Sequence, residues 1–294
     1  MLHFGALEAG GTKMVLSILD ENRQILVRES IPTEPPSVTM PVMIDFFRNH
    51  QVDSLGIGCF GPLDLNPASA SYGSITKTPK LAWKDYPILS KFREALQIPC
   101  AIDTDVNAAA LAEHAYGAAQ GLGSCLYVTI GTGIGGGLVI DGKAVHGLVH
   151  PELGHMLLRP VERDPSPDGF CPYHKGCLEG LAAGPALEKR WGMPAFQIPE
   201  DHVAWDIEAY YLASMCHNAI TAFSPEKIIL GGGVMHQHFL FDKVRRLVAQ
   251  SLNGYIASPA ITDGANDYIV PPGCGENSGV LGAYLLARRA LEEA

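Results

Sequence analysis

One pattern near the start of each half of the chain constrains its fold more than any other: an apolar strand, a glycine turn, a second strand and a hairpin turn. The first copy runs L7-E-A-G-G-T-K-M-V-L-S-I-L-D-E-N, and the second runs T129-I-G-T-G-I-G-G-G-L-V-I-D-G. This repetition predicts two similar α/β domains that face one another, each offering a turn that can contact phosphate.

The rest of the chain alternates between strand and helix patterns. We expect strands at 2–8, 14–20, 25–31, 55–59, 100–103, 125–130, 137–140 and 227–230. We expect helices at 38–49, 88–96, 106–116, 204–223, 239–252 and 277–293. The Gly- and Ala-rich stretch 117–124 is the expected domain junction. It separates an N-terminal domain, 1–117, from a larger domain, 118–276, and the C-terminal helix within 277–294 is expected to pack back on the first domain.

The bulk composition excludes several classes of protein. With 294 residues, the chain is long enough for two domains that each bury a core. The net charge of −10 argues against nucleic acid or an anionic membrane as a partner. No uncharged apolar run could span a bilayer, and the first residues lack the basic start and cleavage site of a signal peptide. Cys59, Cys100 and Cys125 lie in or beside apolar strands, which suits buried, reduced thiols in the cytoplasm.

Four metal-binding side chains gather around a loop that has no periodic apolar face. The loop reads F170-C-P-Y-H-K-G-C-L-E179 and follows H150-P-E-L-G-H155. The predicted ligands of a closed tetrahedral zinc site are His155, Cys171, His174 and Cys177. A loop rich in Pro and Gly cannot hold its shape by burial alone, so a structural metal would fix it. Three other histidines remain alternatives for the fourth ligand: His146, His150 and His202.

The second glycine turn, G131-T-G-I-G-G136, spells the dinucleotide fingerprint G-x-G-x-x-G. That fingerprint needs a helix after the glycines, whose N-terminus meets the pyrophosphate. The next residues, G-L-V-I-D-G, predict a strand and a hairpin, which argues against a Rossmann site. A protein-kinase loop is also strand–turn–strand, but the sequence contains no V-A-I-K, H-R-D or D-F-G. It contains no P-loop pattern either.

The glycine turns suit a nucleotide, because glycine lets backbone N–H groups approach phosphate oxygens closely. A third cluster, I229-L-G-G-G-V-M235, follows a strand and could pass flat against a base or ribose. Any one cluster alone favours a tight turn without a ligand, but three clusters after apolar strands favour a nucleotide. The hydroxyls of Thr12 and Thr132 would add donors, and Glu8 could help to hold Mg²⁺ directly or through water. The expected contacts are Gly10, Gly11, Thr12, Lys13, Gly131, Thr132, Gly133, Leu230, Gly231, Gly232, Gly233 and Val234.

Taken in order, six motifs resemble the ROK (repressor–ORF–kinase) family of bacterial sugar kinases over the whole chain. They are E8-A-G-G-T-K13, D103-T-D-V-N-A-A-A110, G131-T-G-I-G-G-G137, E152-L-G-H155, C171-P-Y-H-K-G-C-L-E179 and G231-G-G-V234. The combination of E-x-G-H with the Cys/His loop is the most specific of them. Within the family, the C-P-Y-H-x-G-C-L-E-G form and the E-A-G-G-T-K opening look most like the zinc-containing bacterial fructokinases.

The resemblance implies an actin-like ATPase (ribonuclease H-like) fold, with two α/β domains around a cleft in which ATP and sugar meet. By this likeness Asp105 is the catalytic base, although either Thr104 or Asp105 could instead cap the helix that follows. The implied sugar contacts are Gly61, Asp105, Glu152, His155 and Glu179. The segment L181-A-A-G-P185 resembles the part that approaches adenine, which implies contacts from Ala182 and Pro185. The family further implies Mg²⁺ with ATP, a structural Zn²⁺ and a homodimer.

Two departures from the family pattern bear on the substrate. Many relatives have Asn where this chain has Thr104, so we count Thr104 among the sugar contacts and expect it to influence which sugar is used. Glu8 stands where many have Asp, which affects the reach toward Mg²⁺. The expected function is ATP-dependent phosphorylation of a hexose at the 6-hydroxyl, with D-fructose as the substrate. The alternatives are a mannose, glucose or N-acetylhexosamine kinase, and a sugar-sensing regulator without catalysis.

Overall fold

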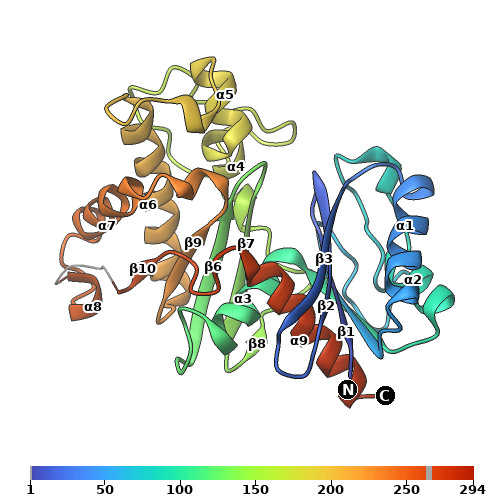
Figure 1. The fold of residues 1–294 in the computed structure, drawn as a ribbon. Coiled ribbons are helices and arrows are strands. Elements are labelled where there is room, and N and C mark those ends of the chain that lie inside the picture. The colour runs from blue at the N-terminus through green and yellow to red at the C-terminus, as the bar shows by residue number, and fades with distance from the viewer. Residues whose placement is uncertain (1, 263–266) are drawn as a thin grey trace. The chain divides into compact units, whose positions relative to one another are not determined.

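The computed structural model describes residues 2–262 and 267–294. The chain divides into two compact units (Figure 1). Unit 1 comprises Met1–Gly117, Gly142–Pro151 and Cys274–Ala294, and unit 2 comprises Ala118–Asp141 and Glu152–Gly273. The continuous domains expected from the sequence differ from this division mainly in the segment Gly142–Pro151, which groups with unit 1. Within the described residues, no helix is long and apolar enough to cross a membrane.

Unit 1 is built on a mixed sheet with the strand order β3-β2-β1-β4-β5. The strands are β1 (Phe4–Ala9), β2 (Lys13–Leu19), β3 (Ile25–Pro32), β4 (Ser54–Cys59) and β5 (Cys100–Thr104). β1 is antiparallel to β2 and parallel to β4, and β4 is parallel to β5. Every residue of β4 is buried, which is the pattern of a strand covered on both faces.

Helices cover both faces of this sheet (Figure 1). They are α1 (Pro36–Asn49) and α2 (Ile88–Leu96) on one face, and α3 (Asp105–Tyr116) and α9 (Ser278–Glu292) on the other. Successive strand residues feed opposite cores: Leu7 belongs to the cluster with Phe47, and Ala6 belongs to the cluster with Tyr284. A β-carbon on Gly56 would lie 1.8 Å from the carbonyl oxygen of Ala283, so α9 packs directly on the backbone of β4.

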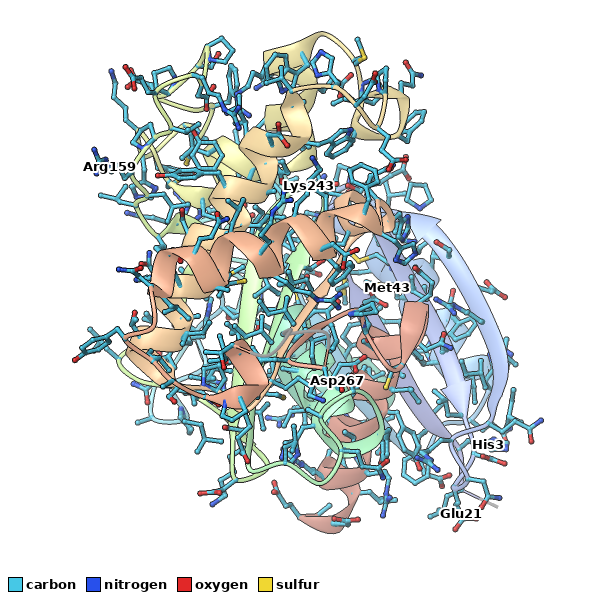
Figure 2. The ribbon with its side chains drawn as sticks, turned by 90° about the vertical axis from the view of Figure 1, so that its left-hand side faces the viewer. His3, Glu21, Met43, Arg159, Lys243 and Asp267 are labelled. Carbon is cyan, nitrogen blue, oxygen red and sulfur yellow. The ribbon has the colours of Figure 1, made fainter. Side chains whose placement is uncertain are left out.

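The strand register of unit 1 brings its functional motifs to one edge of the sheet. His3 and Glu21 lie together at the opposite end, where β1 begins and the β2–β3 hairpin turns (Figure 2). At the functional edge Ala9 is aligned with Cys59, and Cys59 with Thr104. Three loops therefore leave the sheet side by side: the glycine turn after β1, the segment after β4, and the start of α3 after β5.

Unit 2 repeats this topology. The second sheet has the order β10-β9-β6-β7-β8. Its strands are β6 (Ser124–Ile130), β7 (Ile134–Ile140), β9 (Ile228–Gly231) and β10 (Ile269–Val270), with β8 (Lys143–Ala144) as an edge strand from the segment that groups with unit 1. As in unit 1, the first strand is antiparallel to the second and parallel to the fourth. The repeat predicted from the sequence is thus confirmed as two sheets of the same strand order.

The helices of unit 2 are α4 (Leu178–Ala182), α5 (Gly184–Trp191), α6 (Ala204–Phe223), α7 (Phe239–Leu252) and α8 (Pro259–Thr262). Helices α6 and α7 pack together beside the sheet (Figure 1). The ammonium of Lys243 on α7 pairs with Asp206 on α6 at 2.7 Å. Short 3-10 turns occur in unit 2 at Leu153–His155, Ala195–Gln197 and Gly233–His236, and in unit 1 at Leu81–Trp83 and Gly275–Asn277.

Strand β7 begins at Ile134, three residues before the start expected at 137. Its glycines pair with β6 through their backbone, with Gly135 opposite Thr129 and Gly136 opposite Val128. The hydrogen bonds between strands are made by the backbone and need no side chain. Since Gly135 and Gly136 have no apolar side chain, the apolar periodicity of the sequence could not indicate this part of the strand. A strand and not a helix follows the turn Gly131–Gly133, as predicted, which excludes the dinucleotide fingerprint there.

Candidate functional site

The first glycine turn presents unpaired donors at the edge of unit 1. Within the turn, the N–H of Gly10 donates to the carbonyl of Lys13 at 3.0 Å, and the Thr33 hydroxyl donates to the Gly10 carbonyl at 2.8 Å. In the described part of the chain, the N–H groups of Gly11 and Thr12 have no acceptor. Successive free N–H groups in a turn form a concave anion site. The turn can therefore receive phosphate oxygens.

Two carboxylates lie near this turn. Burial raises the pKa of Glu8, and the negative charge of Asp105 raises it further. Burial likewise raises the pKa of Asp105 to about 6, although the N–H of Val106 donates to its carboxylate at 2.9 Å. A carboxylate held at that pKa is ionised near neutral pH and still basic enough to accept a proton. Asp105 thus has the electrostatics of a general base.

Thr104, not Asp105, is the cap of α3. The Thr104 hydroxyl accepts from the N–H of Asn107 at 3.1 Å, and its backbone is extended. Asp105 is the first helical residue. The sequence allowed either Thr104 or Asp105 to cap the helix, and in the structure Thr104 is the cap.

A hydrogen-bond network fixes the start of α3 from outside the helix. One oxygen of Asp103 accepts from the Asn107 amide at 2.8 Å and from the N–H of Thr104 at 2.7 Å. Nε2 of His146 lies 3.1 Å from the same carboxylate, and this hydrogen bond raises the pKa of His146. His146 comes from the Gly142–Pro151 segment, whereas Asp103 ends β5. The network therefore holds Asp105 in place through its neighbours.

A second histidine of that segment fixes the loop after β4. Nε2 of His150 accepts from the N–H of Leu63 at 3.0 Å, and the ring lies beside Gly61. His150 is 5% exposed, and burial lowers its pKa, so the ring stays neutral and can accept. His146 and His150 thus belong to unit 1, and they are not part of the metal-binding cluster. The sequence offered them only as alternative zinc ligands and missed these roles.

The four predicted zinc ligands do come together in unit 2. The ligand atoms of His155, Cys171, His174 and Cys177 all lie within 4.8 Å of one another. Nδ1 of His155 is 3.8 Å from each sulfur, and Nδ1 of His174 is 3.7 Å from Cys171 Sγ. A tetrahedral ion with Zn–S of about 2.3 Å and Zn–N of about 2.0–2.1 Å places sulfur and nitrogen about 3.6 Å apart. The cluster therefore has the size and chemistry of a closed zinc site.

His202, the remaining alternative for the fourth zinc ligand, lies outside the metal-binding cluster. Its Nδ1 accepts from the N–H of Ala204 at the start of α6, and its ring packs on Trp191.

Burial raises the pKa of the Cys177 thiol to about 11, so a bound cation would be needed to deprotonate this thiol near neutral pH.

Helix α4 begins next to Cys177 of the metal-binding cluster and carries Glu179. The Cys177 sulfur accepts from the N–H of Gly180 at 3.4 Å and caps the helix. Oε2 of Glu179 then accepts from the N–H of Ile134, just after the second glycine turn, at 3.0 Å. Glu152 is exposed and precedes the 3-10 turn that bears His155. Of the predicted sugar contacts, His155 belongs to the metal-binding cluster of unit 2 and Glu152 and Glu179 lie within three residues of its members, while Gly61, Thr104 and Asp105 lie in unit 1.

The second glycine turn is tied to the start of α5. The N–H of Gly184 donates to the carbonyl of Gly131 at 2.8 Å, and the N–H of Gly131 donates to Gly133 at 2.9 Å. Thr132 is exposed, as is Thr12 in the first turn. Pro185, the second residue of α5, is partly exposed beside this turn.

The third cluster follows β9 and lies at the same sheet edge, since Gly231 is aligned with Thr129. Gly232 has φ +87°, and a β-carbon there would lie 2.5 Å from the Ile130 carbonyl, so only glycine fits. The side chains of Ala182 and Leu230 are fully buried and that of Val234 nearly so. These three residues therefore present almost no surface to a nucleotide in this structure, although they were predicted as contacts, whereas Gly233 is exposed.

Comparisons with known proteins cover the whole chain. The model of the ROK family matches residues 4–290. A fructokinase from Pediococcus pentosaceus is 47% identical over 290 residues, covering 99% of each protein. A ROK hexokinase from Thermus thermophilus has a TM-score of 0.78 and 30% identity over 100% of both chains. A ROK family glucokinase from Streptomyces griseus, solved with glucose and AMPPNP, has a TM-score of 0.74 and 25% identity, covering 98% of this chain and 99% of that one. The predicted fold is confirmed.

Proposed function

The chain belongs to the ROK family, and on that premise we propose that it transfers the γ-phosphoryl group of ATP to the 6-hydroxyl of D-fructose. The observation that carries the proposal is Asp105 at the start of α3, free of capping and with its pKa raised to about 6 by burial. The charge of Asp105 acts on Glu8, two residues before Gly10, which supports a role beside the transferred phosphate.

The reaction needs one proton acceptor and a set of charge-stabilising donors. A bond forms between the sugar O6 and the γ-phosphorus, and the bond from that phosphorus to the β–γ bridging oxygen breaks. The hydroxyl proton passes to the Asp105 carboxylate, and ADP leaves with the electron pair of the broken bond. The free N–H groups of Gly11 and Thr12 would bind phosphate oxygens, as would the turn Gly131–Gly133, in which Thr132 is exposed.

Mg²⁺ would accompany ATP and would offset the negative charge of its phosphates when bound. Glu8 fits an oxygen ligand for it, directly or through water. The raised pKa of its carboxylate supports this, because a cation at that place would relieve the repulsion from Asp105.

The proposed sugar contacts are Gly61, Thr104, Asp105, Glu152, His155 and Glu179. His155 would bind a structural Zn²⁺ through Nδ1, the atom that points to both cysteines, and would keep Nε2 for a sugar hydroxyl. Zinc would hold this wall of the pocket and would take no part in the chemical step. The four-ligand set leaves no open position for catalysis.

Fructose is favoured by the fructokinases that match along the whole chain and by Thr104, whose hydroxyl already accepts from Asn107. The second candidate is a kinase for glucose, mannose or an N-acetylhexosamine, since a ROK glucokinase shares the fold. A non-catalytic sugar sensor is disfavoured by the intact base and phosphate turns. The family likeness further suggests a homodimer, and seven free cysteines suit the cytoplasm.

An ADP-release assay with Mg·ATP over fructose, mannose, glucose and N-acetylglucosamine tests the proposal. We expect the highest kcat/KM with fructose, and a product whose phosphate is at position 6 by NMR. Preference for another hexose would support the second candidate. Sugar binding without ADP release from any hexose would support the regulator and reject the kinase.

A further inference from the structure

A lysine that no motif singles out lies against the first glycine turn. A β-carbon built on Gly11 would lie 3.7 Å from Cε of Lys80, and the ammonium is one bond beyond. Lys80 is exposed, and within the described residues it has no ion pair or side-chain hydrogen bond. Its charge is therefore available beside the Gly11 and Thr12 N–H groups, which lack acceptors.

The backbone of Lys80 is held firmly although its side chain is free. Its N–H donates to the hydroxyl of Thr78 at 3.3 Å, and its carbonyl accepts from the N–H of Trp83 at 2.8 Å. Trp83 is 1% exposed, its indole donates to the Glu34 carbonyl at 2.8 Å, and it packs edge-on against Phe60. A buried tryptophan thus anchors the loop three residues after Lys80.

A cation beside the first glycine turn would offset the negative charges that gather there when ATP is bound. Glu8 and Asp105 supply two carboxylates, and the substrate brings a triphosphate. The charge of the transferred phosphoryl group is spread over its three equatorial oxygens in the transition state. Lys13 is exposed at the end of the same turn, so Lys80 would be a second ammonium, approaching from a different loop.

The geometry points to Lys80 as a further catalytic residue that contacts the γ-phosphoryl group of ATP, an inference that rests on the proposed kinase function. The ammonium and the N–H groups of Gly11 and Thr12 form one donor set for phosphate oxygens. No bond to Lys80 forms or breaks, and its proton stays on the nitrogen. Its part is to stabilise negative charge as the phosphoryl group moves from the bridging oxygen to the sugar O6.

Steady-state kinetics with fructose and Mg·ATP test this on Lys80→Met, Lys80→Arg and the control Lys77→Met. Lys77 is exposed on the same loop, so its replacement makes the same change in net charge. We expect Lys80→Met to lower kcat by about 10²-fold or more, the scale of losing one preorganised donor, with fructose KM within about threefold. Lys80→Arg should retain most of kcat, and Lys77→Met should match the unaltered protein.

Nucleotide binding gives a readout that needs no turnover. Isothermal titration with ADP and with a non-hydrolysable ATP analogue should show the analogue weakened about tenfold or more in Lys80→Met, with ADP nearly unchanged. Equal weakening of both nucleotides, or kcat within threefold of the unaltered protein, would overturn the inference. If the unaltered protein phosphorylates no hexose, the proposed function fails instead, and the ratio of the two dissociation constants alone decides the role of Lys80.

Discussion

Glu179 and Gly133 approach so closely that a β-carbon on Gly133 would lie 2.7 Å from Oε2 of Glu179. The same oxygen accepts from the N–H of Ile134 at 3.0 Å, so the carboxylate cannot move aside without losing a hydrogen bond. Glu179 is a proposed sugar contact two residues after the proposed metal ligand Cys177, and Gly133 belongs to a proposed phosphate turn. The residues proposed for sugar and for nucleotide in unit 2 are thus in direct contact.

Gly133→Ala should therefore raise the KM for fructose as well as that for ATP. Displacing Glu179 costs on the order of one charge-assisted hydrogen bond, about 1.5–3 kcal/mol, or roughly tenfold or more in fructose KM. Gly131→Ala is the matched comparison, because a β-carbon there would meet nothing within 4 Å. It should raise only the KM for ATP. Equal fructose KM in the two variants would show that the contact is not coupled to sugar binding.

Asp105→Asn should lower kcat by at least about 10²-fold while both substrates still bind. In the unaltered protein, kcat/KM should rise with pH up to a plateau, with an apparent pKa near 6, because the base must lose its proton. The measurement is a pH–rate profile with calorimetric binding of fructose and ADP to the variant. Near-normal turnover by Asp105→Asn would remove the residue from its role.

The free energy of unfolding should change with pH in the opposite direction to kcat/KM. The pKa of Asp105 is higher in the folded protein, about 6, than its ordinary 3.8, so the folded state binds more protons between these values. The free energy of unfolding therefore falls as pH rises through this range. Asn does not titrate. Asp105→Asn should unfold at a higher temperature than the unaltered protein above pH 6, and this advantage should shrink toward pH 4.

Metal analysis should find about one zinc per chain, and Cys171→Ser should lose it. Without the metal, the loop and Glu179 lose their support, so fructose KM should rise more than ATP KM. Cys274→Ser is the control, since this half-buried thiol lies outside the cluster and donates to the Ala112 carbonyl, as a serine could. Protein that contains no zinc, or a Cys171→Ser variant with full activity, would contradict the structural role.

The apolar periodicity of the sequence predicted the helices whose pattern is regular along their whole length. Helices α2 and α6 begin and end at the residues predicted, because their apolar periodicity is uninterrupted. Helix α4 was missed, since it has five residues and starts at a sulfur cap. The cluster of His155, Cys171, His174 and Cys177 was predicted because three of its members lie within seven residues. The roles of His146 and His150 depend on partners 43 and 87 residues away, which no spacing rule encodes.

His150→Leu tests one of these long-range contacts. It leaves the N–H of Leu63 without an acceptor, which costs about 1–3 kcal/mol of stability, and frees the loop that bears Gly61. Fructose KM should rise, whereas His150→Gln, whose amide oxygen can accept, should restore much of the affinity. Leu148→Ala is the control in the same segment, because that side chain is 99% exposed. Equal kinetics for the Leu and Gln variants would mean that the hydrogen bond does not position the loop.

Thr104→Asn tests sugar choice. Asn caps a helix at least as well as Thr, so α3 and the position of Asp105 should be preserved. The larger amide should fill space that suits a furanose ring and should offer a donor and an acceptor to a pyranose hydroxyl. We expect the unaltered protein to prefer fructose over glucose in kcat/KM, and Thr104→Asn to narrow that ratio by about tenfold, the scale of one paired hydroxyl. Steady-state kinetics on fructose, mannose and glucose with both proteins measure it. If the unaltered protein prefers glucose, the substrate assignment is wrong; if the ratio is unchanged in Thr104→Asn, residue 104 does not set it.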